Sequence, residues 1–291
     1  MVSSRRSIWR GPTLGERYAW ARLPQSTVSC QLMHPILAIT GATGTGKTSI
    51  ALAVAERTGA TVLPLDQLHR YRHLPEGTGL DVCALSRVRH YGYQMLSPWE
   101  VSGPARYVEW LRTAVLRVAS FGPVIIEGGC TSYLAKLMGY RDDSVLGRIK
   151  IVALTVSQDA NANSRRIKSR VSAAKVQAVL QETRQLEQQG YLSEAGIPFL
   201  LECESLWKHP EHDERTVAWA VRIAARIYCP AYLAVKGIIT ADSARDRMIV
   251  NVGAIQRYQA SRIEMLLPDA SRFSPHDQLH IVEQLAAGLI H

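Results

Sequence analysis

Short apolar runs alternate with stretches of helical periodicity from about residue 34 onward. Ile36 to Thr40 (ILAIT) is an apolar run between a proline and a glycine, a pattern typical of a buried strand. Similar runs occur over residues 61–65, 124–126 and 149–156. Helical spacing of apolar positions predicts helices over residues 49–58 and 105–119. Short strands separated by helices predict an α/β fold with a parallel sheet covered by helices on both faces.

The pattern changes along the chain and divides it into parts. Beyond about residue 160 strands become scarce, and helical patterns dominate to about Met265. Residues 1–33 are rich in Ser and Arg and lack hydrophobic periodicity, so they are either a targeting peptide or a flexible extension. We favour the extension because no clear amphipathic helix emerges. The predicted parts are a flexible extension (1–33), an α/β core (34–160), a helical substrate-binding region (161–270) and a C-terminal tail (271–291).

Composition excludes several classes of protein. The chain is 47% hydrophobic, so it can bury a core and is not wholly disordered. No apolar run approaches the roughly 18–20 residues that a spanning helix requires, so we expect no membrane association. Its five cysteines form no CxxC pair, which argues against a disulfide scaffold and a zinc ribbon. We expect a reduced, cytoplasmic protein.

The charge is basic but indicates only a broad class of ligand. The formal net charge is +9, and residues 1–33, with five arginines against one glutamate, carry +4 of it. A basic protein suits an anionic ligand, yet phosphate-binding enzymes and nucleic-acid binders share this balance.

Residues Gly41 to Thr48 (GATGTGKT) carry the clearest chemistry. They fit the phosphate-binding pattern G-x-x-x-x-G-K-[ST] at every position, after a predicted strand and before a predicted helix. Gly41, Gly44 and Gly46 allow backbone N–H groups to curl around phosphate oxygens. Lys47 can reach the outer phosphate, and the hydroxyl of Thr48 can bind Mg²⁺. The loop predicts a di- or triphosphate site with Mg²⁺, in a P-loop NTPase-like fold, and leaves the transferred group open.

Two acidic residues follow predicted strands at the edge where such folds bind ligands. Asp66 ends the second strand, where a carboxylate can bind Mg²⁺, act as a base or cap a turn. The third strand ends in Glu127, followed by Gly128 and Gly129, and these glycines let the backbone approach a ligand closely.

At this point the sequence resembles a known family, the isopentenyltransferases. The similar segments are GATGTGKTS, residues 65–80 (LDQLHRYRHLPEGTGL) and residues 125–138 (IIEGGCTSYLAKLM). These enzymes move a dimethylallyl group from its diphosphate to the N6 amine of adenine. One branch makes cytokinins from free AMP, and the other acts on tRNA. The resemblance is specific from His34 to about Val171 and weakens towards Met265.

The resemblance implies roles for individual residues of the donor site. The loop would hold dimethylallyl diphosphate, with Lys47, Thr48 and Mg²⁺ neutralising the leaving group. Thr43 and Arg170 match two further residues that contact the diphosphate in this family, and Arg170 lies in a segment, RIKSRV (residues 166–171), similar to the family's R-x-x-x-R-V helix. Without the resemblance, the basic cluster Arg165 to Arg170 is either a solvated helix face or a phosphate lid.

On the acceptor side, Asp66 matches the carboxylate that accepts the proton of the acceptor amine, which is a poor nucleophile that needs a positioned base. The remaining predicted substrate-binding residues are Thr78, Gly128, Gly129 and Ser132. Thr78 matches a hydroxyl residue that lies near the acceptor phosphate in this family. The alternative interpretation is that Thr78 is only part of an ordinary Gly-Thr-Gly turn.

The branch is chosen mainly from length. Only residues 139–164 separate the double-glycine segment from the basic helix, which leaves no room for the long insert that grips the anticodon arm in the tRNA branch. The segment GGCTS also looks more like the adenylate branch. We therefore favour a free adenine nucleotide, AMP, and cytokinin biosynthesis, and expect tRNA not to be a partner. Tyr71-Arg72, Gly77-Thr78 and the basic charge favour the tRNA branch instead.

Two departures from the family pattern and two other classes of function remain. Residues 77–81 (GTGLD) lack the arginine of the adenylate branch's GSGRP, and residues 216–226 lack the aspartate of the family's D-G-Y-R segment. A tRNA dimethylallyltransferase and a small-molecule or nucleotide kinase are the alternative enzymes. A phosphate-binding regulatory module is the non-enzymatic one.

Overall fold

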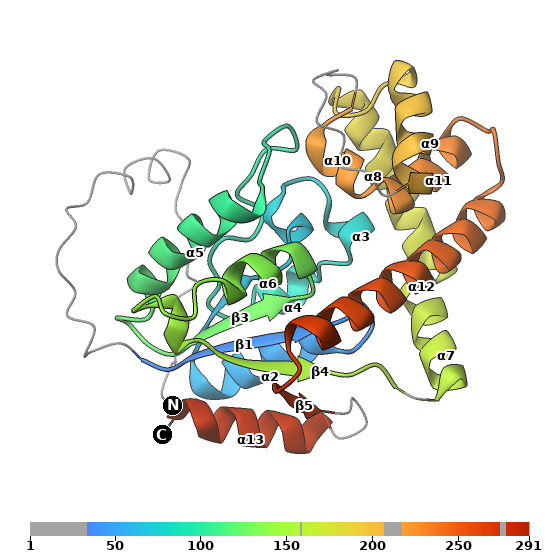
Figure 1. Cartoon of the computed structure of the whole chain (residues 1–291). Helices are drawn as coiled ribbons and strands as arrows, with labels where there is room; N and C mark the ends of the chain where they lie inside the picture. The colour runs from blue at the N-terminus through green and yellow to red at the C-terminus, as the bar shows by residue number, and fades with distance from the viewer. Residues whose placement is uncertain (1–33, 158, 207–216, 274–277, 291) are drawn as a thin grey trace, which may run out of the picture. The chain divides into compact units, whose positions relative to one another are not determined.

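The computed structural model describes residues 34–157, 159–206, 217–273 and 278–290. The predicted extension, residues 1–33, lies outside this part. The described chain forms a five-stranded parallel sheet in the order β2-β3-β1-β4-β5 (Figure 1). The strands are β1 (Ile36–Gly41), β2 (Thr61–Pro64), β3 (Val124–Gly128), β4 (Lys150–Leu154) and β5 (Ser271–Phe273).

Helices cover both faces of the sheet, as the sequence predicts. Successive residues of β1 point to opposite faces because side chains alternate along a strand. Ile36 and Ala38 pack with α5 (Pro104–Val118) and α6 (Thr131–Met138). Leu37 and Ile39 pack with α2 (Lys47–Thr58). The predicted α/β class is confirmed.

The second half is mainly helical and has its own apolar core. It contains α7 (Ala160–Arg170), α8 (Ala173–Gln188), α9 (Ile197–Leu206), α10 (Trp219–Ile223), α11 (Ala225–Val235) and α12 (Ala241–Leu266). Tyr71 and Leu74, from the connection after β2, are buried in the same core. That connection, with the short helices α3 (Pro75–Thr78) and α4 (Val82–Leu85), therefore joins the sheet edge to the helical part.

The long helix α12 links the two parts directly. Thr240 caps its N-terminus by accepting a hydrogen bond from the N–H of Ser243 at 3.1 Å. The helix packs on α8 and α11 near its start and lies over α6 and β1 further along (Figure 1). It thus carries side chains from the helical core to the loop after β1.

The described part of the predicted C-terminal tail, residues 271–291, forms a strand and a helix. β5 pairs in parallel with β4, and α13 (Gln278–Ile290) packs against α2 beneath the sheet (Figure 1). The reason is a row of apolar side chains at helical spacing that covers one face of the sheet: Ile281, Val282, Leu285, Ala286 and Leu289. No helix of the described part is both long and apolar enough to cross a membrane.

Replacing Leu285 by alanine is expected to destabilise the fold by about 2–5 kcal/mol, because a buried leucine is lost from the core and a cavity remains. Chemical denaturation measures this change. Gln284, exposed on the same helix, is the matched control, and its alanine variant should stay within about 0.5 kcal/mol of the parent. Equal effects of the two substitutions would show that α13 is not part of the core.

Candidate active site

The loop after β1 adopts a backbone that requires glycine at two places. Gly44 and Gly46 have φ angles of 85° and 84°, in the left-handed region that other residues rarely adopt. At Gly41 a Cβ atom would lie 2.6 Å from Oγ1 of Thr45. The glycines predicted to bind phosphate are therefore needed to form the loop itself, and the loop leads directly into the N-terminus of α2.

Lys47 and Thr48 lie beside a buried carboxylate. Lys47 is buried, and this burial lowers the pKa of its ammonium, although Glu127 and Asp66 act in the opposite direction. The hydroxyl of Thr48 donates a hydrogen bond of 2.6 Å to Oε1 of Glu127, whose side chain is fully buried at the end of β3. A hydroxyl and a carboxylate oxygen side by side are ligands that suit Mg²⁺.

These two oxygens cannot complete a magnesium site alone. No group of three His, Cys, Asp or Glu side chains in the described part of the chain is arranged to hold a metal ion. Because Mg²⁺ usually keeps few protein ligands and uses substrate phosphates for the rest, Thr48 and Glu127 fit an ion that arrives with a diphosphate.

Asp66 lies at the end of β2, close to the phosphate loop. Its Oδ1 accepts a hydrogen bond of 3.0 Å from the N–H of Leu68. Burial would raise the pKa of this carboxyl, but His69, Lys47, the Leu68 N–H and Arg170 together lower it below 3.8. Asp66 is therefore ionised at neutral pH.

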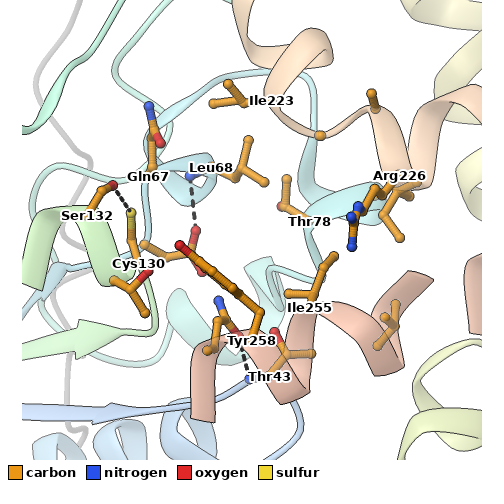
Figure 2. Close-up of a pocket in the computed structure, with 18 of the residues that line it drawn as sticks. Thr43, Gln67, Leu68, Thr78, Cys130, Ser132, Ile223, Arg226, Ile255 and Tyr258 are labelled. Carbon is orange, nitrogen blue, oxygen red and sulfur yellow. Dashed lines mark hydrogen bonds between the residues drawn. The ribbon is translucent and has the colours of Figure 1, made fainter. Parts of the chain in front are cut away.

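A cavity of about 310 Å³ opens beside these groups. Figure 2 shows Cys130 and Ser132 on one side and Arg226 on the opposite side, while Tyr258 projects from α12 into the space between. Five predicted site residues line the cavity: Thr43, Asp66, Thr78, Ser132 and Arg170. Its apolar wall, which sequence reasoning did not find, includes Leu68, Ile223, Ile227, Val252 and Ile255.

Arg170 is held in place by backbone of α3. Its Nη2 donates a hydrogen bond of 3.1 Å to the carbonyl oxygen of Thr78. At Gly79, with a φ angle of 72°, a Cβ atom would lie 2.6 Å from the same nitrogen. Arg165 of the same basic cluster is exposed and lies 3.8 Å from Asp159. Arg170 is also exposed to solvent, but it lines the cavity, and its role in a phosphate lid stays a prediction.

Three predicted substrate-binding residues have structural roles that the sequence does not reveal. The hydroxyl of Thr78 donates to the carbonyl oxygen of Leu74 at 2.7 Å, within α3. A Cβ atom at Gly128 would overlap the backbone of Asp66, and one at Gly129 would overlap the carbonyl oxygen of Gly41. Neither glycine lines the cavity; both allow the end of β3 to pack closely against Asp66 and the phosphate loop. Their contact with substrate stays a prediction.

Two glutamines of α12, Gln256 and Gln259, bind the phosphate loop. Oε1 of Gln259 accepts from the N–H of Thr43 at 2.8 Å, and its Nε2 donates to the carbonyl oxygen of Gly129 at 3.0 Å. Nε2 of Gln256 donates to the carbonyl oxygen of Thr43 at 2.7 Å. The available signal was their spacing of three positions, which places both on one face of a helix.

Comparison with known proteins shows which family this chain resembles. A model of the family described as "Isopentenyl transferase" matches residues 34–209. A tRNA dimethylallyltransferase of Solibacter usitatus is 29% identical over 163 residues, 53% of either chain. One of Mycolicibacterium smegmatis is 34% identical over 109 residues, 36% of either chain. The chain thus spans at most about half the length of these curated relatives.

Solved structures give the same fold. The tRNA delta(2)-isopentenylpyrophosphate transferase of Staphylococcus epidermidis superposes with a TM-score of 0.67 at 13% identity, over 88% of this chain and 99% of that one. A eukaryotic dimethylallyltransferase acting on tRNA superposes with a TM-score of 0.62 at 16% identity, over 84% of this chain and 74% of that one. At these identities the likeness establishes the fold.

The expectation that tRNA is not a partner is contradicted by these relatives, which are named as tRNA enzymes. The physical argument for it was the missing insert between residues 139 and 164. That argument fails because the Staphylococcus protein, itself named a tRNA enzyme, is covered over 99% of its chain. The family itself rests on firmer ground, since its model matches more than half of the 291 residues. The chain belongs to the isopentenyl transferase family.

Proposed function

We propose that this chain transfers a dimethylallyl group from dimethylallyl diphosphate to the N6 amine of an adenine in tRNA. The observation that carries the proposal is that an ionised carboxylate, Asp66, and Thr43 of the phosphate loop line the same cavity. A transferase needs this arrangement because the acceptor amine and the leaving diphosphate must lie on opposite sides of one carbon atom.

The donor site combines cations with an apolar wall. Lys47 and Arg170 each lie near the carboxylates of Asp66 and Glu127 and would supply positive charge for a diphosphate. Thr43 borders the cavity. When bound, Mg²⁺ held by Thr48 and Glu127 would neutralise charge that develops on the diphosphate. The apolar side chains that line the cavity, Leu68, Ile223 and Ile255 among them, suit a five-carbon allylic chain.

Asp66 suits the role of proton acceptor at the amine. A carboxylate with a lowered pKa does not deprotonate a neutral amine before attack. It accepts a hydrogen bond and then takes the proton as the new N–C bond forms, the allylic C–O bond breaks and the amine nitrogen becomes acidic. The products of this step are the prenylated adenine, the departed diphosphate and a protonated Asp66.

The acceptor is proposed from the relatives and the charge. The matching relatives are named for tRNA, and a net charge of +9 suits a phosphate backbone. Free AMP is the second candidate, favoured by one observation: the segment GGCTS (residues 128–132) looks more like the adenylate branch of the family.

The test is incubation of the full chain with dimethylallyl diphosphate, Mg²⁺ and either an unmodified tRNA transcript or AMP. Nucleoside digests are then analysed by mass spectrometry. The proposal predicts prenylated adenosine in the tRNA digest and none from AMP. Prenylated product from AMP but not from tRNA would contradict tRNA as the acceptor, while still supporting prenyl transfer. Absence of product in both reactions would overturn the proposal.

The lowered pKa of Asp66 also predicts the pH dependence of turnover. A group whose folded pKa lies below 3.8 stays ionised as the pH falls through the range where histidines titrate. Turnover in a single-turnover assay should therefore show no Asp66-dependent loss from about pH 8 to about pH 5, and should fall only as the pH approaches the carboxyl pKa. An acid limb between these two values that disappears in the Asp66→Asn variant would contradict this assignment.

A further inference from the structure

One buried carboxylate outside the cavity holds the backbone of α3 through several hydrogen bonds. Glu182 of α8 is buried at 5% exposure. Its Oε2 accepts from the N–H of Glu76 at 2.7 Å, and its Oε1 accepts from the N–H of Gly77 at 2.9 Å. The hydroxyl of Tyr228 donates to the same Oε1 at 2.6 Å. Both carboxylate oxygens are thus used to fix the first turn of α3.

Packing on the same side of α3 leaves this turn little freedom. The ring of Tyr228 is fully buried, and a Cβ atom at Gly77 would overlap it. Nζ of Lys175 lies 2.5 Å from the carboxylate of Glu76, which ties the turn to α8 a second time. A glycine, a tyrosine ring and two polar contacts thus restrain the backbone of α3 relative to α8 and α11.

The C-terminal end of α3 contacts Arg170. Arg170 donates to the carbonyl oxygen of Thr78 and lies across Gly79, and its guanidinium lines the cavity that also contains Asp66. Glu182 and Arg170 therefore bind the two ends of the same four-residue helix: Glu182 accepts from N–H groups near its start, and Arg170 donates to the carbonyl oxygen of its last residue. A shift of α3 would move the carbonyl oxygen of Thr78, to which the guanidinium of Arg170 donates its hydrogen bond.

We propose that Glu182 is a positioning residue for the transfer reaction: it fixes α3 so that the Thr78 carbonyl holds the Arg170 guanidinium at the diphosphate. This inference rests on the proposed function for the identity of the diphosphate donor. Glu182 touches neither the cavity nor a reacting atom, so its effect on the reaction passes through α3 and Arg170.

Glu182→Gln is the variant that tests this role. Glutamine keeps the volume but replaces one accepting oxygen by an NH₂ group, which cannot accept from a backbone N–H. The turn must then shift or leave a donor unpaired. Since a misplaced electrostatic contact to a leaving group is felt mainly in the chemical step, kcat should fall about tenfold while KM for the acceptor changes little.

Glu187→Gln is the matched control. Glu187 lies on the same helix, and its Oε1 accepts from the hydroxyl of Tyr232, on α11, at 3.1 Å, just as Glu182 accepts from Tyr228. Its other partner is Lys236, at 2.5 Å. The control makes the same change to a carboxylate that binds a tyrosine hydroxyl, without touching α3, and it should leave turnover at the parent level.

A double-mutant cycle separates positioning from a general loss of structure. Glu182→Gln and Arg170→Ala are measured singly and together, in single-turnover assays and in calorimetric binding of magnesium pyrophosphate. Because Glu182 acts through Arg170, adding Glu182→Gln to Arg170→Ala should cost little more. The double variant should have a single-turnover rate constant and a pyrophosphate affinity no more than about twofold below those of Arg170→Ala alone. Losses that multiply, or a Glu182→Gln variant indistinguishable from Glu187→Gln, would overturn the proposal.

The two readouts keep this inference distinct from the proposed function. Pyrophosphate binding requires no prenyl transfer, so its cycle reports on Glu182 even where the parent forms no prenylated product. Circular dichroism checks each fold. If Glu182→Gln does not fold, Tyr228→Phe replaces it in the cycle, because this change removes a single hydrogen bond from the carboxylate of Glu182. It should lower turnover and pyrophosphate affinity by a smaller factor, and it should have no further effect when Arg170 is already alanine.

Discussion

Replacing Lys47 by alanine is expected to lower prenyl transfer by at least about 10³-fold, because the departing diphosphate loses a buried cation in a site of low dielectric. The ammonium is buried beside Glu127 and Asp66, where no water can take over its charge efficiently. Binding of magnesium pyrophosphate should weaken as well. Single-turnover kinetics and calorimetry measure the two effects.

Lys168→Ala is the control for this prediction. Lys168 is an exposed cation on α7, two positions before Arg170, so its loss changes the net charge by the same amount without touching the loop. It should leave turnover within about threefold of the parent, as expected for an exposed surface charge. A folded Lys47→Ala protein with near-normal turnover would exclude the loop as the donor site.

Asp66→Asn is expected to lower transfer by roughly 10²–10⁴-fold, the usual range for a positioned proton acceptor. Asparagine keeps an oxygen that can accept from the Leu68 N–H, so the turn after β2 should persist. Affinity for magnesium pyrophosphate should change little, because the phosphate loop is intact. Turnover, pyrophosphate affinity and melting temperature are measured on this one variant.

Three interpretations of Asp66 give different results in that experiment: a proton acceptor for the amine, a turn cap, and a base for an acceptor hydroxyl in a kinase. A proton acceptor predicts lost turnover with an unchanged melting temperature. A turn cap predicts a lower melting temperature with intact specific activity, which would contradict the mechanism. A kinase predicts that the parent protein phosphorylates a small acceptor from ATP and makes no use of dimethylallyl diphosphate.

The parts of the fold that could be predicted are those encoded by neighbouring residues. β1 and β3 are apolar runs that end at glycines, and the phosphate loop has a fixed spacing that few other structures use. Asp66 could be placed at the cavity because the carboxyl ends of parallel strands meet at one edge of the sheet. Arg170 could be predicted only because the segment around it resembles a segment of the family. The neighbouring residues by themselves are equally typical of a solvent-exposed helix.

The parts that could not be predicted depend on contacts between distant segments. Gln259 and Thr43, which share a hydrogen bond, are 216 positions apart. Glu182 and Gly77 are 105 positions apart, and nothing local distinguishes Glu182 from Glu187, the other glutamate of α8. β5 is short and mostly exposed, so it lacks the apolar pattern that revealed the other strands. Thr78 matched a family position, yet the turn of α3 directs its hydroxyl to Leu74.

The measurement that tests the central claim most directly is a rapid-quench single turnover with dimethylallyl diphosphate, Mg²⁺ and a tRNA transcript, in which pyrophosphate and prenylated adenosine are quantified together. Transfer at the cavity predicts that the two products form in equal amounts and at one rate in the parent protein. It also predicts that both are lost in Lys47→Ala. Pyrophosphate release without a prenylated adenine, or phosphorylation from ATP with neither product, would contradict the account.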